Sequence, residues 1–349
     1  MRWALVAALM LATVCAAAQE TVRKGDKEVE LTPEGCRIER YTIPSPCMKR
    51  DIRVAVVLPP DYDARPEERY PILYTLHGAR APYDTWSQMS PLRRVLRDKP
   101  MIVTCFDGDE VGMYIDSRPD SQFTTFFFDE FVPYMDEHYR VNGLRGVTGF
   151  SMGGYGAFHY MLTKPDMFAS VSLLSSGFRQ GRPGPRPVDS PAPPPGEGRD
   201  RQGPPRPSRD EQGPPGVVRE QPEGQAAGRP RGFSRPPIHD RIVQYVADGV
   251  KLPPMMMHCG TEDRGLEPSR EFATFLTEQN KIIRERLESQ VAGIEDQRER
   301  RGKLSELMAE HGLNFMYKES PGGHNWEFWR DASEAVAEFH WKSFQKAAE

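Results

Sequence analysis

Apolar residues along this chain gather in short runs, and stretches with apolar residues at helical spacing separate several of these runs. Nearly continuous apolar runs are typical of strands covered on both faces, whereas alternating runs indicate strands with one exposed face. The expected strands are 37–43 and 50–58, which alternate, and 71–76, 101–106, 168–174, 254–259 and 313–319. The expected helices are 123–139, 155–164 and 326–346. Strands that alternate with helices predict an α/β fold with a mostly parallel, doubly covered sheet and an antiparallel N-terminal edge.

Two segments interrupt this rhythm. Residues 180–237 contain about half of the chain's 33 prolines, many glycines and a single aromatic residue, Phe233. Such a composition cannot bury enough apolar surface to offset the entropy of ordering, so we expect a disordered insert that acts as a solvated linker or a mobile flap. Residues 268–312 instead carry apolar residues at helical spacing, which predicts an extended helix or helical hairpin.

The first residues indicate an export signal. Met1-Arg2 is a short basic start, residues 3–15 are apolar but too few to span a bilayer comfortably, and Ala16-Ala17-Ala18 forms a cleavage motif. We therefore expect a signal peptide at 1–18, a single domain over 19–349, a secreted or periplasmic location and no membrane insertion after cleavage. The polar stretch 19–31 is expected to form a loose start.

Charge and cysteine content narrow the chemistry. The formal net charge of −4 indicates no strongly charged partner, and arginines in 180–237 alternate with acidic residues, so no nucleic acid is expected. Cys36 and Cys47 flank an expected hairpin and could pair in an oxidising compartment, whereas Cys105 and Cys259 end apolar runs and are expected to be buried thiols. Without a CxxC or HExxH motif, neither a metal site nor a cofactor is predicted.

One short motif carries the candidate chemistry. Gly149, Ser151 and Gly153 form a G-x-S-x-G pattern. In a nucleophile elbow, a strand turns sharply into a helix with the serine at the bend, and the flanking residues must be small so that strand and helix can pass closely. Here the strand-like run 146–148 precedes the serine, and the expected helix 155–164 and strand 168–174 follow it. This context favours a catalytic serine over a glycine-rich turn.

A serine hydroxyl needs a base that takes its proton and a carboxylate that orients the base. In a hydrolase fold of this kind the order along the chain is Ser, acid, His, each at the carboxyl end of a strand. His324 follows the last expected strand through Gly322-Gly323 and is the expected base. Four other histidines after the serine lie within expected helices or strands and are not expected to serve: His159, His258, His311 and His340.

Two acids follow the strand 254–259, Glu262 and Asp263. We favour Asp263 as the orienting carboxylate, because its shorter side chain suits a loop that follows Gly260. Asp107 and Asp116 precede the serine, which is the wrong order, and are expected to line the substrate pocket or to cap loops.

Acyl transfer also needs N–H donors for the oxyanion. The N–H of Met152, directly after the serine, is one expected donor. The loop 77–80 after the strand 71–76 supplies the other, and Ala79 is the favoured residue, while His77 is expected to brace this loop. Arg80 and Trp326 are further candidates for the substrate pocket.

These residues resemble a known group, the "putative esterase" family of α/β-hydrolases, which includes feruloyl, acetyl-xylan and enterochelin-type esterases, S-formylglutathione hydrolase and the mycolyltransferases. The matching stretches are 58–62 (LPPDY), 70–78 (YPILYTLHG), 149–157 (GFSMGGYGA), 259–263 (CGTED) and 321–329 (PGGHNWEFW). The resemblance implies the α/β-hydrolase fold and the same Ser151, Asp263 and His324 set, with Met152 and Ala79 as oxyanion donors. The insert 180–237 and the long helical segment after Asp263 differ from the family pattern.

The sequence therefore predicts an exported serine carboxylesterase. Its expected substrates are extracellular acyl or feruloyl esters of carbohydrate, or other small esters. Acyl transfer to an alcohol, as in the mycolyltransferases, is one alternative, because both reactions share an acyl-enzyme and only product analysis separates them. A module that binds glycan or cell wall without turnover is another alternative. The sequence gives no indication of the oligomeric state.

Overall fold

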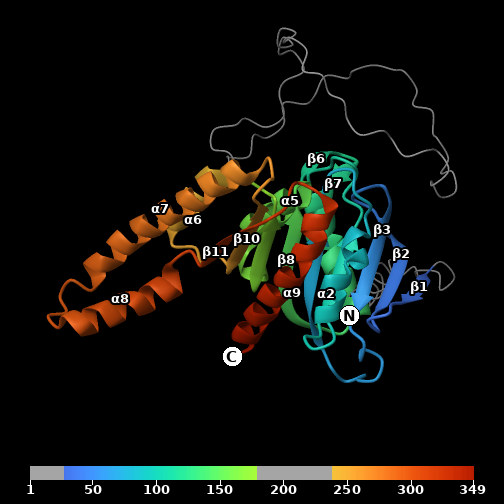
Figure 1. Ribbon diagram of the computed structural model, residues 1–349, viewed down its shortest axis with the longest axis horizontal. Helices are drawn as coiled ribbons and strands as arrows, with labels where there is room; N and C mark the ends of the chain where they lie inside the picture. The colour runs from blue at the N-terminus through green and yellow to red at the C-terminus, as the bar shows by residue number, and fades with distance from the viewer. Residues whose placement is uncertain (1–26, 179–237) are drawn as a thin grey trace, which may run out of the picture. The chain divides into compact units, whose positions relative to one another are not determined.

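The structure is a computed structural model that describes residues 27–178 and 238–349 (Figure 1). These residues belong to one unit of the chain, Met1–Gln180 with Pro236–Glu349, and the second unit is Gly181–Arg235. The expected signal peptide at 1–18 and the expected disordered insert at 180–237 lie outside the described residues.

A nine-stranded sheet forms the centre of the described chain, in the order β1-β2-β3-β5-β4-β8-β9-β10-β11. The pairs that join β1, β2, β3 and β5 are antiparallel, and the remaining pairs are parallel. This topology confirms the predicted fold class. The strands are β1 Glu28–Leu31, β2 Arg37–Ser45, β3 Arg50–Leu58, β4 Tyr70–Leu76, β5 Ile102–Phe106, β8 Val141–Phe150, β9 Ser170–Leu174, β10 Met255–Gly260 and β11 Phe315–Ser320.

Helices cover both faces of this sheet (Figure 1). In the described part of the chain, no helix combines the length and the apolar character that crossing a bilayer requires. The α-helices are α2 Ser90–Val95, α3 Phe123–Thr125, α4 Val132–His138, α5 Met152–Thr163, α6 Ile238–Asp248, α7 Leu266–Gln290, α8 Gln297–His311 and α9 Trp326–Ala348. Shorter elements are the 3-10 turns η2 Thr85–Gln88 and η4 Pro165–Met167, the π-helical turn η3 Phe126–Phe131, and a hairpin of β6 Asp116–Arg118 and β7 Ser121–Gln122.

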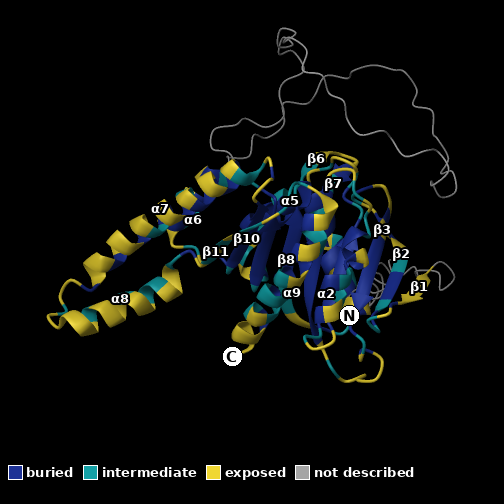
Figure 2. Cartoon of the chain, viewed as in Figure 1, coloured by how far each residue is buried: buried dark blue, intermediate teal, exposed yellow. Residues whose placement is uncertain are grey.

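Two apolar clusters hold these layers together, one on each face of the sheet. Helices α2 and α9 pack over one face, around residues such as Trp86, Val336 and Phe344. The other face carries an aromatic group that includes Phe127 and Tyr160, whose rings stack with centroids 4.2 Å apart. Strand β4 is buried at every position, as its continuous apolar run predicts, and Figure 2 shows the central strands as the most buried part of the chain.

Residues 268–312 contain most of α7 and all of α8, which form a helical hairpin at the β10–β11 end of the sheet (Figure 1). Helix α7 buries Phe272, Leu276 and Ile283, while every residue of α8 keeps some exposure (Figure 2). Asn280 of α7 joins the hairpin to the segment before β11. Its Nδ2 donates to the Leu313 carbonyl at 2.9 Å, and its Oδ1 accepts from the Leu313 N–H at 2.7 Å.

Three features differ from the sequence pattern. The expectation of a loose start over 19–31 is wrong for 28–31, because β1 pairs with β2 although all of its residues are exposed. Helix α6 follows the insert and was not predicted. The expected helix 123–139 contains the π-helical turn η3, and this wider turn accompanies the burial of three consecutive phenylalanines, 126–128.

Of the two predictions about cysteines, one is confirmed and one is wrong. Cys105 and Cys259 are buried free thiols, as predicted. The prediction that Cys36 and Cys47 could form a disulfide is wrong, because both are free thiols. They stand at opposite ends of the nine-residue strand β2, which spans about 30 Å at roughly 3.3 Å per residue, whereas a disulfide needs Cα atoms within about 7 Å.

A buried histidine attaches α9 to the sheet. His340 is fully buried, with Nδ1 2.7 Å from the Ser170 hydroxyl and Nε2 2.9 Å from the Ser172 hydroxyl. Burial lowers the pKa of His340 to about 3. The folded protein therefore holds this ring neutral, whereas an unfolded histidine takes up a proton near pH 6.5.

This difference predicts acid sensitivity. Between about pH 6.5 and pH 3 only the unfolded state binds this proton, so stability that is present above pH 6.5 is lost as the pH falls. When the pH falls from 7 to 5, the free energy of unfolding should decrease in wild type and in His340→Gln. We expect the decrease to be about 2 kcal/mol smaller in His340→Gln. Urea unfolding at both pH values measures this. Equal losses in the two proteins would assign the sensitivity to other groups.

Candidate active site

The three residues predicted to act together lie after neighbouring strands. Ser151 follows β8, Asp263 follows β10 and His324 follows β11. Strands β8, β9, β10 and β11 are adjacent and parallel, so their carboxyl ends share one edge of the sheet, where α/β folds place their sites.

The backbone at Ser151 is strained. Ser151 has φ 53° and ψ −117° at the start of α5, a conformation that L-residues adopt only where the surroundings hold them. A Cβ atom on Gly153 would lie 2.1 Å from the Leu76 carbonyl oxygen, and one on Gly149 would lie 2.2 Å from the Gly153 carbonyl carbon. The glycines of the motif are therefore required by the close passage of β8, β4 and α5.

The loop after β9 holds the bend in place. The Ser151 N–H donates to the Leu174 carbonyl at 2.9 Å. The Ser176 hydroxyl lies 3.1 Å from the Ser151 carbonyl oxygen and 2.8 Å from that of Leu174. Both backbone polar groups of the strained residue are thus engaged.

The side chains of Ser151, His324 and Asp263 meet at this bend. Ser151 Oγ lies 2.9 Å from His324 Nε2, and His324 Nδ1 lies 3.0 Å from each Asp263 carboxylate oxygen. With the proton of the neutral ring on Nδ1, the ring donates to the carboxylate and accepts from the serine hydroxyl. The His324 side chain is 19% exposed and that of Asp263 is 0% exposed.

The buried carboxylate is held in its charged form. Burial acts to raise the pKa of Asp263, but hydrogen bonds outweigh it, and the pKa lies below the usual value. The donors are the His324 ring, the Ser175 hydroxyl and the Gly265 N–H, which lies 2.7 Å from Oδ1. The neighbouring acid, Glu262, is exposed. The structure thus brings Asp263 to His324, the acid favoured from the sequence.

The loops that carry the acid and the base also contact each other. The Glu262 N–H donates to the Gly322 carbonyl at 2.9 Å. A Cβ atom on Gly260 would lie 2.1 Å from the same carbonyl oxygen. Asn325 then caps the N-terminus of α9, since its side chain accepts from the Phe328 N–H at 3.1 Å. His324 is therefore fixed between a strand end and a helix cap.

The predicted oxyanion donors come from two separate segments of the chain. Met152 is the first residue of α5 and is buried, whereas Ala79 is exposed in the loop after β4. His77 braces this loop as expected, because its Nε2 accepts from the Gly108 N–H at 2.9 Å. Gly78 packs against the Phe150 ring, where an added Cβ would lie 2.6 Å from a ring carbon.

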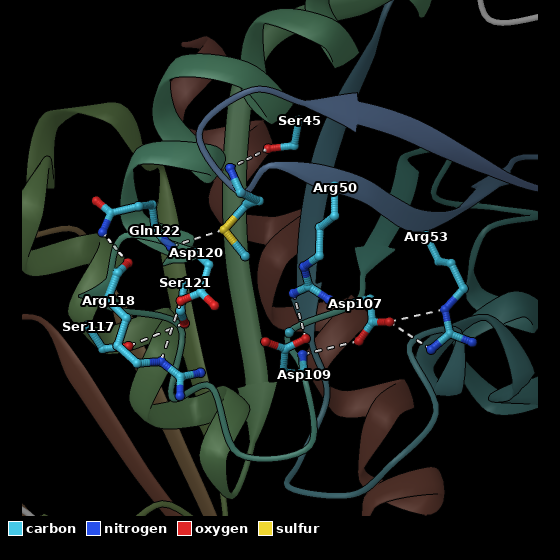
Figure 3. A network of polar contacts seen from close by, with 12 residues as sticks. Ser45, Arg50, Arg53, Asp107, Asp109, Ser117, Arg118, Asp120, Ser121 and Gln122 are labelled. Atoms are coloured by element: carbon cyan, nitrogen blue, oxygen red, sulfur yellow. Dashed lines mark hydrogen bonds and ion pairs between the residues drawn. The ribbon is translucent and has the colours of Figure 1, made fainter. Parts of the chain in front are cut away.

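The candidate pocket acids hold loops in this structure. Asp107 Oδ2 accepts from Arg53 at 2.7 and 3.0 Å, and Figure 3 shows this pair beside the Arg50–Asp109 pair. Asp116 Oδ1 accepts from the Thr124 N–H at 2.7 Å, at the start of α3. Of the two roles expected for Asp107 and Asp116, the structure shows the loop-capping one.

The remaining candidates differ in position. Arg80 is exposed and has φ 62°, and its N–H donates to the Glu110 carbonyl at 2.9 Å. Trp326 begins α9 and is 36% exposed. His258 is buried in β10 with Nε2 2.8 Å from the Ser320 hydroxyl, and burial lowers its pKa to about 4. Within the described residues, no three His, Cys, Asp or Glu side chains group as metal ligands.

The serines after β9 were not predicted as functional residues. Ser175 and Ser176 contact the acid and the elbow, respectively. Two hydroxyl residues directly after a buried strand, next to the elbow unit, were the available signal. That signal is weak, because serines are also common in turns.

The fold and the meeting of Ser151, His324 and Asp263 at a nucleophile elbow define the α/β-hydrolase class. Residues 45–205 match the family model described as "Putative esterase". Esterase Rv1288 of Mycobacterium tuberculosis is 35% identical over 133 residues, which cover 35% of this chain and 28% of that protein. The chain thus matches little more than a quarter of this relative's length.

Solved structures share the fold. A ferulic acid esterase aligns with a TM-score of 0.57 and 21% identity, over 88% of this chain and 98% of that one. An S-formylglutathione hydrolase from Agrobacterium tumefaciens aligns with a TM-score of 0.55 and 16% identity, over 91% of this chain and 99% of that one. The serine hydrolase FphF of Staphylococcus aureus aligns with a TM-score of 0.58 and 15% identity, over 91% of this chain and 99% of that one. These similarities support the fold confirmed above.

The crowding at the elbow gives a sharp stability prediction. Gly153→Ala places a methyl group 2.1 Å from a backbone oxygen, so the free energy of unfolding should fall by at least about 3 kcal/mol. Gly302→Ala is the matched control in α8, where nothing lies within 4 Å, and should stabilise the protein by about 1 kcal/mol. Urea unfolding compares the two variants. A Gly153→Ala protein as stable as wild type would contradict this description of the elbow.

Proposed function

We propose that the protein is a serine carboxylesterase that forms an acyl-enzyme on Ser151. The observation that carries the proposal is the continuous contact from Ser151 Oγ to His324 Nε2 at 2.9 Å and from His324 Nδ1 to Asp263 at 3.0 Å. A strained serine at the end of a strand, with a base and a buried carboxylate in line, is the arrangement that activates a hydroxyl nucleophile.

The proposed reaction has two halves. His324 Nε2 takes the Ser151 proton as Oγ attacks the ester carbonyl, and the N–H groups of Met152 and Ala79 stabilise the oxyanion, each contributing about 3 kcal/mol. The tetrahedral intermediate collapses, and His324 gives its proton to the leaving alcohol. Water then loses a proton to His324 and attacks the acyl-enzyme. As the second tetrahedral intermediate collapses, His324 returns that proton to Ser151 Oγ, and the carboxylic acid and free Ser151 are released.

Asp263 stabilises the charge that forms on the base. Its lowered pKa keeps the carboxylate ionised at neutral pH, so it favours the imidazolium that His324 becomes when it accepts the serine proton. Its hydrogen bond also keeps the ring proton on Nδ1, which leaves Nε2 free to act as the base.

For the substrate, we propose acyl or feruloyl esters of carbohydrate, or similar small esters. The match of residues 45–205 to the "Putative esterase" family model and the similarity to a ferulic acid esterase support this class. We also propose export to the periplasm or the medium, which rests on the basic start, the apolar residues 3–15 and the Ala16-Ala17-Ala18 motif.

The first test is labelling of the purified protein with a fluorophosphonate, followed by mapping of the modified peptide by mass spectrometry. We expect stoichiometric label on Ser151, and none on Ser151→Ala or on folded His324→Ala. Turnover of p-nitrophenyl acetate and methyl ferulate should fall by at least roughly 10⁴-fold in Ser151→Ala. A folded wild type that is neither labelled nor active, or a Ser151→Ala variant that keeps its activity, would refute the proposal.

The choice between the two neighbouring acids gives a second test. Asp263→Asn keeps the shape of the side chain but stabilises the wrong ring tautomer, so kcat should fall by roughly 10⁴-fold. Glu262→Gln changes the exposed neighbour and should leave kcat within about twofold of wild type. Steady-state kinetics on p-nitrophenyl acetate compare them. If Glu262→Gln proves the more damaging change, the assignment of the acid is wrong.

A further inference from the structure

Trp329 contacts His324 itself and a neighbour of each of the other two active-site residues, Ser151 and Asp263. It lies in the first turn of α9, after His324. Its ring stacks on Phe150, the residue before Ser151, with centroids 4.4 Å apart and planes 18° apart. Its ring also meets the His324 ring edge to face at 5.1 Å.

The indole N–H makes the third connection. Trp329 Nε1 donates to the Ser175 hydroxyl oxygen at 2.9 Å. Ser175 follows β9 with φ 53°, and its N–H donates to the His258 carbonyl at 2.9 Å, so its backbone is held. The Ser175 side chain is close enough to Asp263 to lower the pKa of that carboxyl by hydrogen bonding.

The direction of this relay follows from donor chemistry. An indole nitrogen only donates, and a serine hydroxyl has one proton and accepts through its oxygen. Because Trp329 supplies a proton to the Ser175 oxygen, the single Ser175 proton is free to point to Asp263. The Asp263 side chain is fully buried. Loss of the Ser175 donor would therefore leave the carboxylate with one hydrogen bond fewer, at a place where water cannot easily replace it.

We infer that Trp329 is a positioning residue, which fixes Asp263 through the Ser175 hydroxyl and fixes His324 through its ring face. This inference rests on the proposed function, in which Asp263 and His324 act as acid and base. Trp329 touches neither the reacting atoms nor a substrate in this assignment. Its effect should therefore fall on kcat and not on KM.

A purely structural role predicts something different. A tryptophan that only fills space on this face of the sheet should tolerate phenylalanine with little effect on kcat, because the stacked ring is kept. Trp329→Phe removes the Nε1–H and retains an aromatic ring against Phe150 and His324. The two roles therefore separate in one substitution.

The experiment measures kcat and KM on p-nitrophenyl acetate together with the low-field proton NMR signal of His324 Nδ1–H. We expect Trp329→Phe to lower kcat by about tenfold, with KM within about twofold of wild type, because the Ser175 hydroxyl loses the donor that directs its own proton toward the buried Asp263 carboxylate. The low-field signal should shift or broaden. Trp341→Phe, a partly buried position further along α9, is the matched control and should match wild type in all three readouts.

A double-mutant cycle tests the route through the hydroxyl. Ser175→Ala should lower kcat by about tenfold as well, and the double variant should also lie near tenfold instead of near a hundredfold, because both changes break one relay. Ser175→Gly, which accepts the positive φ without strain, provides the same loss of the hydroxyl if Ser175→Ala does not fold.

The outcomes distinguish this inference from the proposed function. Wild-type kcat in Trp329→Phe, with an unmoved low-field signal, would overturn the inference while leaving the esterase proposal intact. Independent, multiplicative losses in the cycle would also overturn it. If wild type neither labels nor turns over esters, the proposed function fails. A low-field signal that shifts or broadens in Trp329→Phe but stays unchanged in Trp341→Phe would still support the positioning role.

Discussion

The close passage of α5 beneath the end of β4 is the constraint on which the rest of the site depends. The backbone of Gly153 lies so near the Leu76 carbonyl that a methyl group has no room, and the same bend gives Ser151 its positive φ. Strained backbone persists only where neighbouring groups hold it. Here the loop after β9 engages both the N–H and the C=O of Ser151, and the parallel strands beyond it bring His324 and Asp263 to the same point.

The features that could be predicted from the sequence have local signals. Strand β4 is a continuous apolar run, and the elbow follows from two glycines around a serine. The features that could not be predicted depend on distant partners. Strand β1 alternates polar and apolar residues over only four positions, which is too short a pattern to predict a strand. It is held by its ladder to β2 and by the Arg40 ion pair with Glu30. The role of Asp116 depends on the amide of Thr124, which only the fold brings to it.

Helix α9 is attached to β9 and its following loop by side-chain hydrogen bonds at two places. Trp329 donates to Ser175 near the start of the helix, and His340 lies between Ser170 and Ser172 further along. These positions are about 16 Å apart along a helix that rises 1.5 Å per residue. Apolar packing tolerates small sliding movements, but directional hydrogen bonds at two separated points do not. The helix that follows His324 is thereby fixed in both translation and rotation against the sheet.

The link between Asn280 and Leu313 bears on how the chain folds. Asp263 and His324 are 61 residues apart in sequence, and strands β10 and β11 must pair before the two can meet. Closing so long a connection costs chain entropy, and non-local pairing slows folding. The α7–α8 hairpin consists of local contacts, and Asn280 returns the chain to β11 after only 33 residues. The hairpin therefore shortens the effective loop, and its formation should precede the assembly of the acid and the base.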